Sequence, residues 1–141
     1  MKKEIFIEII SYAFFVLFLY TGLSKLASFD IYVRDLNRSP YLDTYAPLIS
    51  IFVPAAELIV AGLLLSKKTR QYGLLGSLVL MFFFSIYVFY IVLFTTHRPC
   101  TCGGIIRQLS WPNHLIFNLS FLLLAIWGFL LQTKRTKEYI L

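Results

Sequence analysis

Two cysteines separated by one residue are the most reactive side chains in this 141-residue sequence. Cys100 and Cys102 lie in the stretch HRPCTCGG, residues 97–104, and the chain has no other cysteine. A disulfide between them would close a very small ring and would be strained, and strained disulfides are easily reduced. A structural disulfide stabilises a protein by closing a long loop, which this pair does not do. The spacing therefore favours a redox-active pair over a structural crosslink.

The residues around the two cysteines favour the reactive thiolate form. Arg98 brings positive charge close in sequence, and His97 adds to it when protonated. A helix predicted to begin shortly after this stretch would also direct its positive end toward the same surface, and each of these effects stabilises a thiolate. Gly103 and Gly104 allow a tight bend and the close approach of another protein. We therefore expect a thiol pair that exchanges with a partner.

Two other interpretations of these residues stay open. His97 and His114 supply two nitrogens that could join the two cysteine sulfurs in a tetrahedral zinc site or a copper site. A single residue between the cysteines is unusual for zinc, and His114 is predicted to lie inside a helix, so we assign no metal ligand. The remaining interpretation is that the cysteines are small, unreactive residues.

Four apolar stretches must position these side chains. The chain is 59% hydrophobic and only 14% charged, whereas soluble domains average about 25% charged residues. A helix needs about 20 mainly apolar residues to cross a membrane, and continuous apolar runs without alternation argue against strands. We therefore predict an all-α, polytopic membrane protein that forms one domain, a four-transmembrane-helix bundle over residues 1–141. The predicted spans are residues 5–26, 45–65, 72–95 and 113–131.

A short helix is predicted between the first two spans, in residues 28–42. Apolar side chains recur there at helical spacing, and charged ones occupy the other face, namely Asp30, Arg34, Asp35 and Arg38. This pattern is typical of a helix lying in the membrane interface, and Ser39-Pro40 would end it. An ordinary surface helix with no gating role is the alternative.

The lysines and arginines predict the direction of the spans. Eight belong to the N-terminus, the link after the second span and the C-terminal tail, and five belong to the other side. Because positive residues favour the cytoplasmic side, we predict a multi-pass protein of the bacterial cytoplasmic (inner) membrane with both termini in the cytoplasm. The loop with Cys100 and Cys102 would then face the oxidising periplasm. The net charge of +6 forms no stripe, so we expect no nucleic-acid partner.

Polar residues inside the spans are candidate functional residues. Glu57 lies near the middle of the second span, where a carboxyl group by default indicates function. Lys25 is its candidate counter-ion, and the pair would either handle a proton during thiol or quinone chemistry or simply hold two helices together. His114 and Asn118 are four residues apart and share one face of the fourth span. His114 would either move protons beside the thiols or be hydrated at the interface.

The ordered set of these features resembles the MauE branch of the DoxX-like membrane proteins. The matching pieces are TGLSKL at 21–26, SP at 39–40, PAAELIVAGLLL at 54–65, and HRPCTCGG followed by SWPNHLIFN. The resemblance implies a four-helix membrane bundle with a redox-associated role, in which Cys100 and Cys102 are the redox pair. It also implies a thioredoxin-like periplasmic partner, because MauE is linked to maturation of a disulfide-rich periplasmic dehydrogenase subunit.

Two functional hypotheses follow. In the first, the cysteines exchange a disulfide with a periplasmic thioredoxin-like or other envelope protein, with quinone as the candidate cofactor. In the second, the chain is a non-catalytic membrane subunit or an assembly factor of an envelope complex. The sequence leaves open whether the chain is a component of a thiol-disulfide oxidoreductase and whether it forms oligomers. Its apolar faces are expected to contact membrane lipid.

Overall fold

The computed structural model describes residues 2–38, 42–94 and 111–141, and every regular element in these ranges is a helix. The five helices are α1 (Lys2–Ala27), α2 (Phe29–Arg38), α3 (Ala46–Leu65), α4 (Arg70–Phe94) and α5 (Trp111–Ile140). Among them α1, α3, α4 and α5 are long and apolar enough to cross a membrane, and each corresponds to one predicted span. The last helix continues to Ile140, beyond the predicted end of the fourth span at residue 131. The all-helical fold with four candidate spans is thus confirmed.

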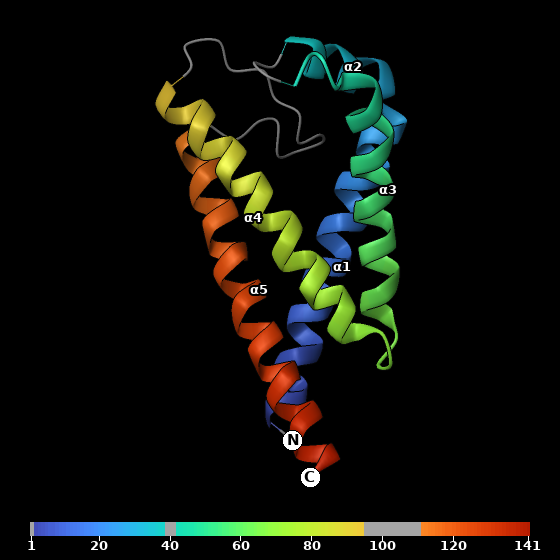
Figure 1. Ribbon diagram of the computed structural model, residues 1–141, viewed down its shortest axis with the longest axis vertical. Coiled ribbons are helices and arrows are strands. Elements are labelled where there is room, and N and C mark those ends of the chain that lie inside the picture. Colours follow the sequence, from blue (N-terminus) through green and yellow to red (C-terminus); the bar gives the residue numbers. More distant parts are fainter. Residues whose placement is uncertain (1, 39–41, 95–110) are drawn as a thin grey trace.

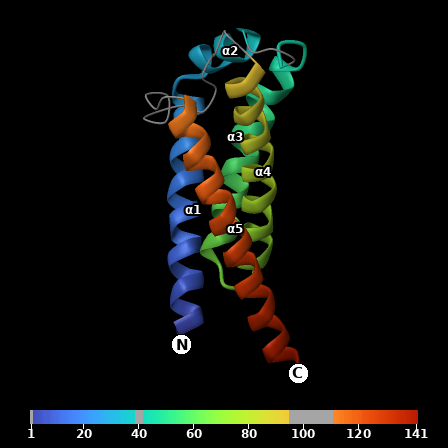
Figure 2. The ribbon, with the colours of Figure 1, turned by 90° about the vertical axis from the view of Figure 1, so that its left-hand side faces the viewer.

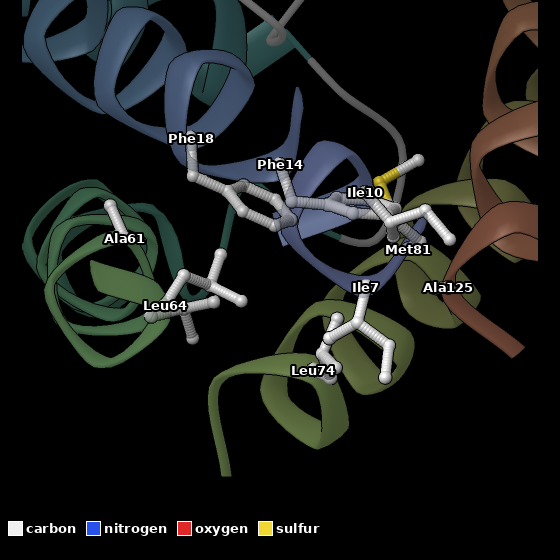
Figure 3. Close-up of a cluster of buried hydrophobic side chains, with 10 residues drawn as sticks. Ile7, Ile10, Phe14, Phe18, Ala61, Leu64, Leu74, Met81 and Ala125 are labelled. Carbon is white, nitrogen blue, oxygen red and sulfur yellow. The ribbon is translucent and has the colours of Figure 1, made fainter. Parts of the chain in front are cut away.

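The four long helices form a bundle in which neighbours meet in the order α1, α3, α4, α5 and back to α1 (Figures 1 and 2). Their shared core is apolar, and Figure 3 shows Phe14, Leu64 and Met81 directed into it. The ring of Phe14 meets Phe121 of α5 edge to face, with ring centroids 5.3 Å apart. Outside this core, most large apolar side chains of the spans are exposed, as expected for helices surrounded by lipid.

A tight turn makes α3 and α4 antiparallel neighbours. The backbone N–H of Thr69 donates to the Ser66 carbonyl at 3.2 Å, and the Thr69 hydroxyl donates to the Leu63 carbonyl at 2.8 Å. Beyond the turn, a Cβ atom added to Gly73 would lie 2.9 Å from the backbone nitrogen of Leu64. Glycine is therefore required where α4 passes the end of α3.

The helix predicted between the first two spans is present as α2, and it lies across the end of the bundle opposite to the termini (Figures 1 and 2). Its side chains Tyr32 and Leu36 are buried with Ala46 in a small second core. Asp35 was expected on the polar face, but it is buried. The buried face of α2 therefore differs from the one that its apolar residues define, since Phe29 is exposed and Asp35 is buried. Its location in a membrane interface stays a prediction.

Both chain termini lie at one end of the bundle, together with the turn between α3 and α4 (Figure 1). Ion pairs join the first and last helices there, with Lys3 Nζ 3.1 Å from Glu138 Oε1 and Arg135 Nη2 3.0 Å from Glu4 Oε1. Ion pairs near the surface contribute little to stability, typically about 0–1 kcal/mol each. The three positively charged segments therefore share one end, as the lysine and arginine pattern predicts.

Candidate functional site

A buried ion pair joins α1 to α3 inside the bundle. Lys25 Nζ donates to both carboxylate oxygens of Glu57, at 2.8 and 3.0 Å, and the Thr21 hydroxyl donates to Oε1 at 3.2 Å. The exposed fraction is 4% for the Lys25 side chain and 1% for Glu57. Lys25 therefore reaches inward, and the predicted contact with Glu57 forms. Whether the pair has a functional role stays a prediction.

Helical spacing and one small residue explain this geometry. Thr21 and Lys25 are four residues apart near the end of α1, so both project from the same face toward α3. Gly22 lies on the face of α1 that meets α3, and a Cβ atom there would come within 3.1 Å of the Leu58 side chain. The absence of a side chain at Gly22 lets the two helices approach closely enough for the Glu57 carboxylate to receive all three hydrogen bonds.

Aromatic rings from two further helices face the ammonium group. Lys25 Nζ lies 5.9 Å from the ring centroid of Tyr32 in α2 and 5.7 Å from that of Phe84 in α4. A cation at this distance from an aromatic ring is attracted by the ring quadrupole, if it lies over the face. The three consecutive phenylalanines at 82–84 therefore have different surroundings. Phe82 and Phe83 are exposed, whereas Phe84 contacts the ion pair. Groups from three helices, α2, α3 and α4, thus surround the ammonium group that α1 contributes.

The ion pair borders a cavity of about 620 Å³ that also contacts α5. His114 and Asn118 both line this cavity, and their exposed fractions are 2% and 4%. The two residues therefore share a buried face of α5, as their spacing predicts. In the part of the chain that the structure describes, the Asn118 Nδ2 atom has no hydrogen-bond acceptor. An amide donor that is buried without an acceptor is costly, since it has lost its hydrogen bonds to water.

The remaining predicted site residues lie outside the described residues. They are His97, Arg98, Cys100, Cys102, Gly103 and Gly104. All belong to residues 95–110, which connect the end of α4 to the start of α5. Within the described ranges no group of three potential ligands could hold a metal ion, but most of the ligands considered for a metal site belong to residues 95–110. The redox, metal and unreactive interpretations of the cysteines therefore stay predictions.

Sequence reasoning did not identify three residues that complete the ion-pair site. Thr21, Tyr32 and Phe84 surround the two charged groups. A signal existed for Thr21, because it is a polar residue one helical turn before a lysine in an apolar span. No comparable signal distinguishes Tyr32 or Phe84 from the many other aromatic residues, since their roles depend on how α2 and α4 cross α1.

The fold and the site define a class of protein, a multi-pass helical membrane protein with a buried ion pair beside a cavity between its helices. Comparison with known families then identifies the chain as a member of the MauE family. The family model described as "Methylamine utilisation protein MauE" matches residues 3–131. The wider relationship to DoxX-like proteins stays a prediction. No curated protein and no solved structure matches the chain significantly.

Proposed function

We propose that this MauE-family protein performs thiol–disulfide exchange through Cys100 and Cys102 and thereby supports the maturation or redox state of a periplasmic partner. The partner would be a thioredoxin-like or other envelope protein. The observation that carries the proposal is the pair of cysteines, one residue apart, as the only thiols of an apolar chain. Membership of a family named for methylamine utilisation gives a membrane setting and a physiological context, and the proposal does not depend on any particular substrate.

The exchange conserves electrons and protons. A thiolate of the reduced pair attacks a disulfide of the partner, which forms a mixed disulfide and releases one partner thiol. The second cysteine then attacks the mixed disulfide, which leaves a Cys100–Cys102 disulfide and a fully reduced partner. The reverse sequence oxidises the partner. A strained disulfide suits this role, because it is easily reduced and reformed.

The positions of the two helix ends that flank residues 95–110 support an encounter with a partner. The described end of α4 and the described start of α5 both lie at the end of the bundle that holds α2, away from the termini (Figure 1), and residues 95–110 connect these two points in the sequence. We propose that this end faces the periplasm and that both termini lie in the cytoplasm. Membrane-impermeant maleimide tests this orientation, because only two thiols exist. It should label spheroplasts and not inverted vesicles, and the opposite pattern would reverse the proposed direction.

A redox equilibrium tests the proposed chemistry. The purified full-length protein in detergent is equilibrated with mixtures of reduced and oxidised glutathione, and its thiols are counted by mass spectrometry after alkylation. We expect a two-electron transition and rapid exchange with a thioredoxin-like protein. The thiol-free variant Cys100→Ser/Cys102→Ser is the matched control. Thiols that stay inert to oxidant, dithiothreitol and thioredoxin-like proteins would contradict the proposal.

A second candidate is a non-catalytic membrane subunit or assembly factor. One observation favours it: Gly62 lies on an exposed face of α3, and a Cβ atom there would meet nothing within 4 Å. Small residues on a lipid-facing surface allow another helix to pack closely. If the variant Cys100→Ser/Cys102→Ser kept full activity in cells while Gly62→Leu abolished it, the assembly role would replace the redox role.

A further inference from the structure

The cavity of about 620 Å³ lies between α1, α2 and α3 on one side and α4 and α5 on the other. Its volume falls within the range of about 300–1,000 Å³ that small-molecule sites occupy. Its lining combines a polar group at one place with aromatic and aliphatic walls elsewhere. Such a combination is typical of a site that fixes the polar head of an otherwise apolar ligand.

The polar part of the lining includes Asn118, whose buried amide donor has no acceptor among the described residues. Asn118 is 4% exposed, it lines the cavity, and no described atom accepts a hydrogen bond from its Nδ2. The Lys25–Glu57 pair and Thr21 line the same cavity. The Glu57 carboxylate already accepts three hydrogen bonds there. A ligand with an oxygen acceptor would satisfy Asn118 without disturbing the ion pair.

The rest of the lining suits a planar ring and an apolar tail. The aromatic residues in the wall are Phe18, Tyr32, Phe84, Tyr87, Tyr90 and Phe117. Rings of this kind stack against another planar ring or meet it edge to face. Phe83 and Ile86 also line the cavity, and their exposed fractions are 61% and 51%. The cavity therefore opens onto the outer surface of α4, where a ligand dissolved in the membrane could enter sideways.

We propose that this cavity binds a membrane-soluble quinone. A ring carbonyl accepts the hydrogen bond from Asn118 Nδ2, the ring packs against the aromatic wall, and the isoprenoid tail leaves past Phe83 and Ile86. A hydrocarbon chain of a lipid would also fill apolar space. It has no acceptor for Asn118, so the carbonyl-bearing ring matches the lining better.

Quinone binding would give the thiol chemistry an electron acceptor. A reduced Cys100–Cys102 pair that transfers two electrons and two protons to a quinone becomes a disulfide, and the quinone becomes a hydroquinone. This link rests on the proposed function, whereas binding in the cavity does not. The thiol-free variant Cys100→Ser/Cys102→Ser should therefore still bind quinone.

Binding of decylubiquinone to the full-length protein in detergent tests the site, with decylbenzene as a probe that has the same tail and no carbonyl. Asn118→Leu should weaken decylubiquinone binding about tenfold, the value of one buried hydrogen bond. Gln132→Leu is the matched control, because Gln132 is a buried amide of the same helix that does not line the cavity. It should bind decylubiquinone as the wild type does.

Photolabelling of the unmodified chain with an azidoquinone gives a test that needs no variant. The label should fall on peptides from residues 81–90 of α4 or 111–121 of α5. Labelling elsewhere, or an absence of saturable decylubiquinone binding, would overturn the proposal. Equal binding of decylubiquinone and decylbenzene, with neither affected by Asn118→Leu, would instead assign the cavity to lipid chains. If quinone binds and the thiols are inert, the site stands and the proposed function fails.

Discussion

Replacing Lys25 with methionine should destabilise the bundle strongly, because it leaves a buried carboxylate without its counter-ion. Methionine keeps the length of the aliphatic side chain and removes the ammonium group. Glu57 would then keep only the hydrogen bond from Thr21, out of the three that it accepts. With 1% of its side chain exposed, the carboxylate cannot replace the lost bonds with water.

The expected loss follows from the burial of the pair. Removing one partner of a buried ion pair typically costs about 3–5 kcal/mol. Because each 1.4 kcal/mol is a factor of about ten, the unfolded fraction should rise by about a hundredfold to several thousandfold. Equilibrium unfolding in mixed detergent–dodecyl sulfate micelles, followed by tryptophan fluorescence, measures this change.

Two control variants make the measurement specific. The double variant Lys25→Met/Glu57→Met removes both charges and should recover most of the lost stability, since apolar replacements of buried pairs are often neutral or stabilising. The exposed pair Lys3–Glu138 has a similar distance of 3.1 Å, and Lys3→Met should cost about 1 kcal/mol or less. If Lys25→Met were no more destabilising than Lys3→Met, the buried ion pair would not hold α1 to α3 as described.

Three further predictions concern the packing of the bundle. Gly73→Ala should destabilise the bundle by about 1–3 kcal/mol, because the added Cβ atom would lie 2.9 Å from the backbone of Leu64. Gly62→Ala is the control, because a Cβ atom there meets no atom within 4 Å, and it should be neutral or stabilising in the same unfolding assay. Thr21→Val should cost about 1.5–3 kcal/mol, the value of a hydrogen bond to a charged group, and a loss below 0.5 kcal/mol would contradict that bond. Phe14→Ala should cost about 3–5 kcal/mol by opening a cavity in the core, and a thermal midpoint equal to that of the wild type would contradict its central position.

The sequence predicts the large features of the fold because they depend on local composition. Each long apolar run becomes one helix, since a chain in lipid must satisfy its own backbone hydrogen bonds. The contact of Lys25 with Glu57 is also predictable, because a charged side chain in an apolar span is stabilised by pairing with an opposite charge. The four-residue spacing of His114 and Asn118 predicts that both lie on one face of α5, and the structure shows that this face is buried.

Features that depend on how helices cross could not be predicted. The cavity exists because α4 and α5 diverge from α1 and α3 toward the end that holds α2, as Figure 1 shows. The crossing angle between these helices depends on how they pack together, so the sequence of one helix does not predict it. The burial of Asp35 reflects the packing of α2 on the bundle. Phe84 contacts the ion pair while Phe83 faces outward, although the two are adjacent and chemically identical.

Trapping of mixed disulfides in cells tests the proposed exchange most directly. In the variant Cys102→Ser, Cys100 can attack a partner disulfide, but this chain has no second thiol that could complete the exchange and release a reduced partner. We predict a reducible adduct on Cys100 that contains a thioredoxin-like or other envelope protein and that is missing from Cys100→Ser/Cys102→Ser. A Cys102→Ser variant that carries no protein adduct, in cells where the wild-type thiols are accessible to maleimide, would contradict the account.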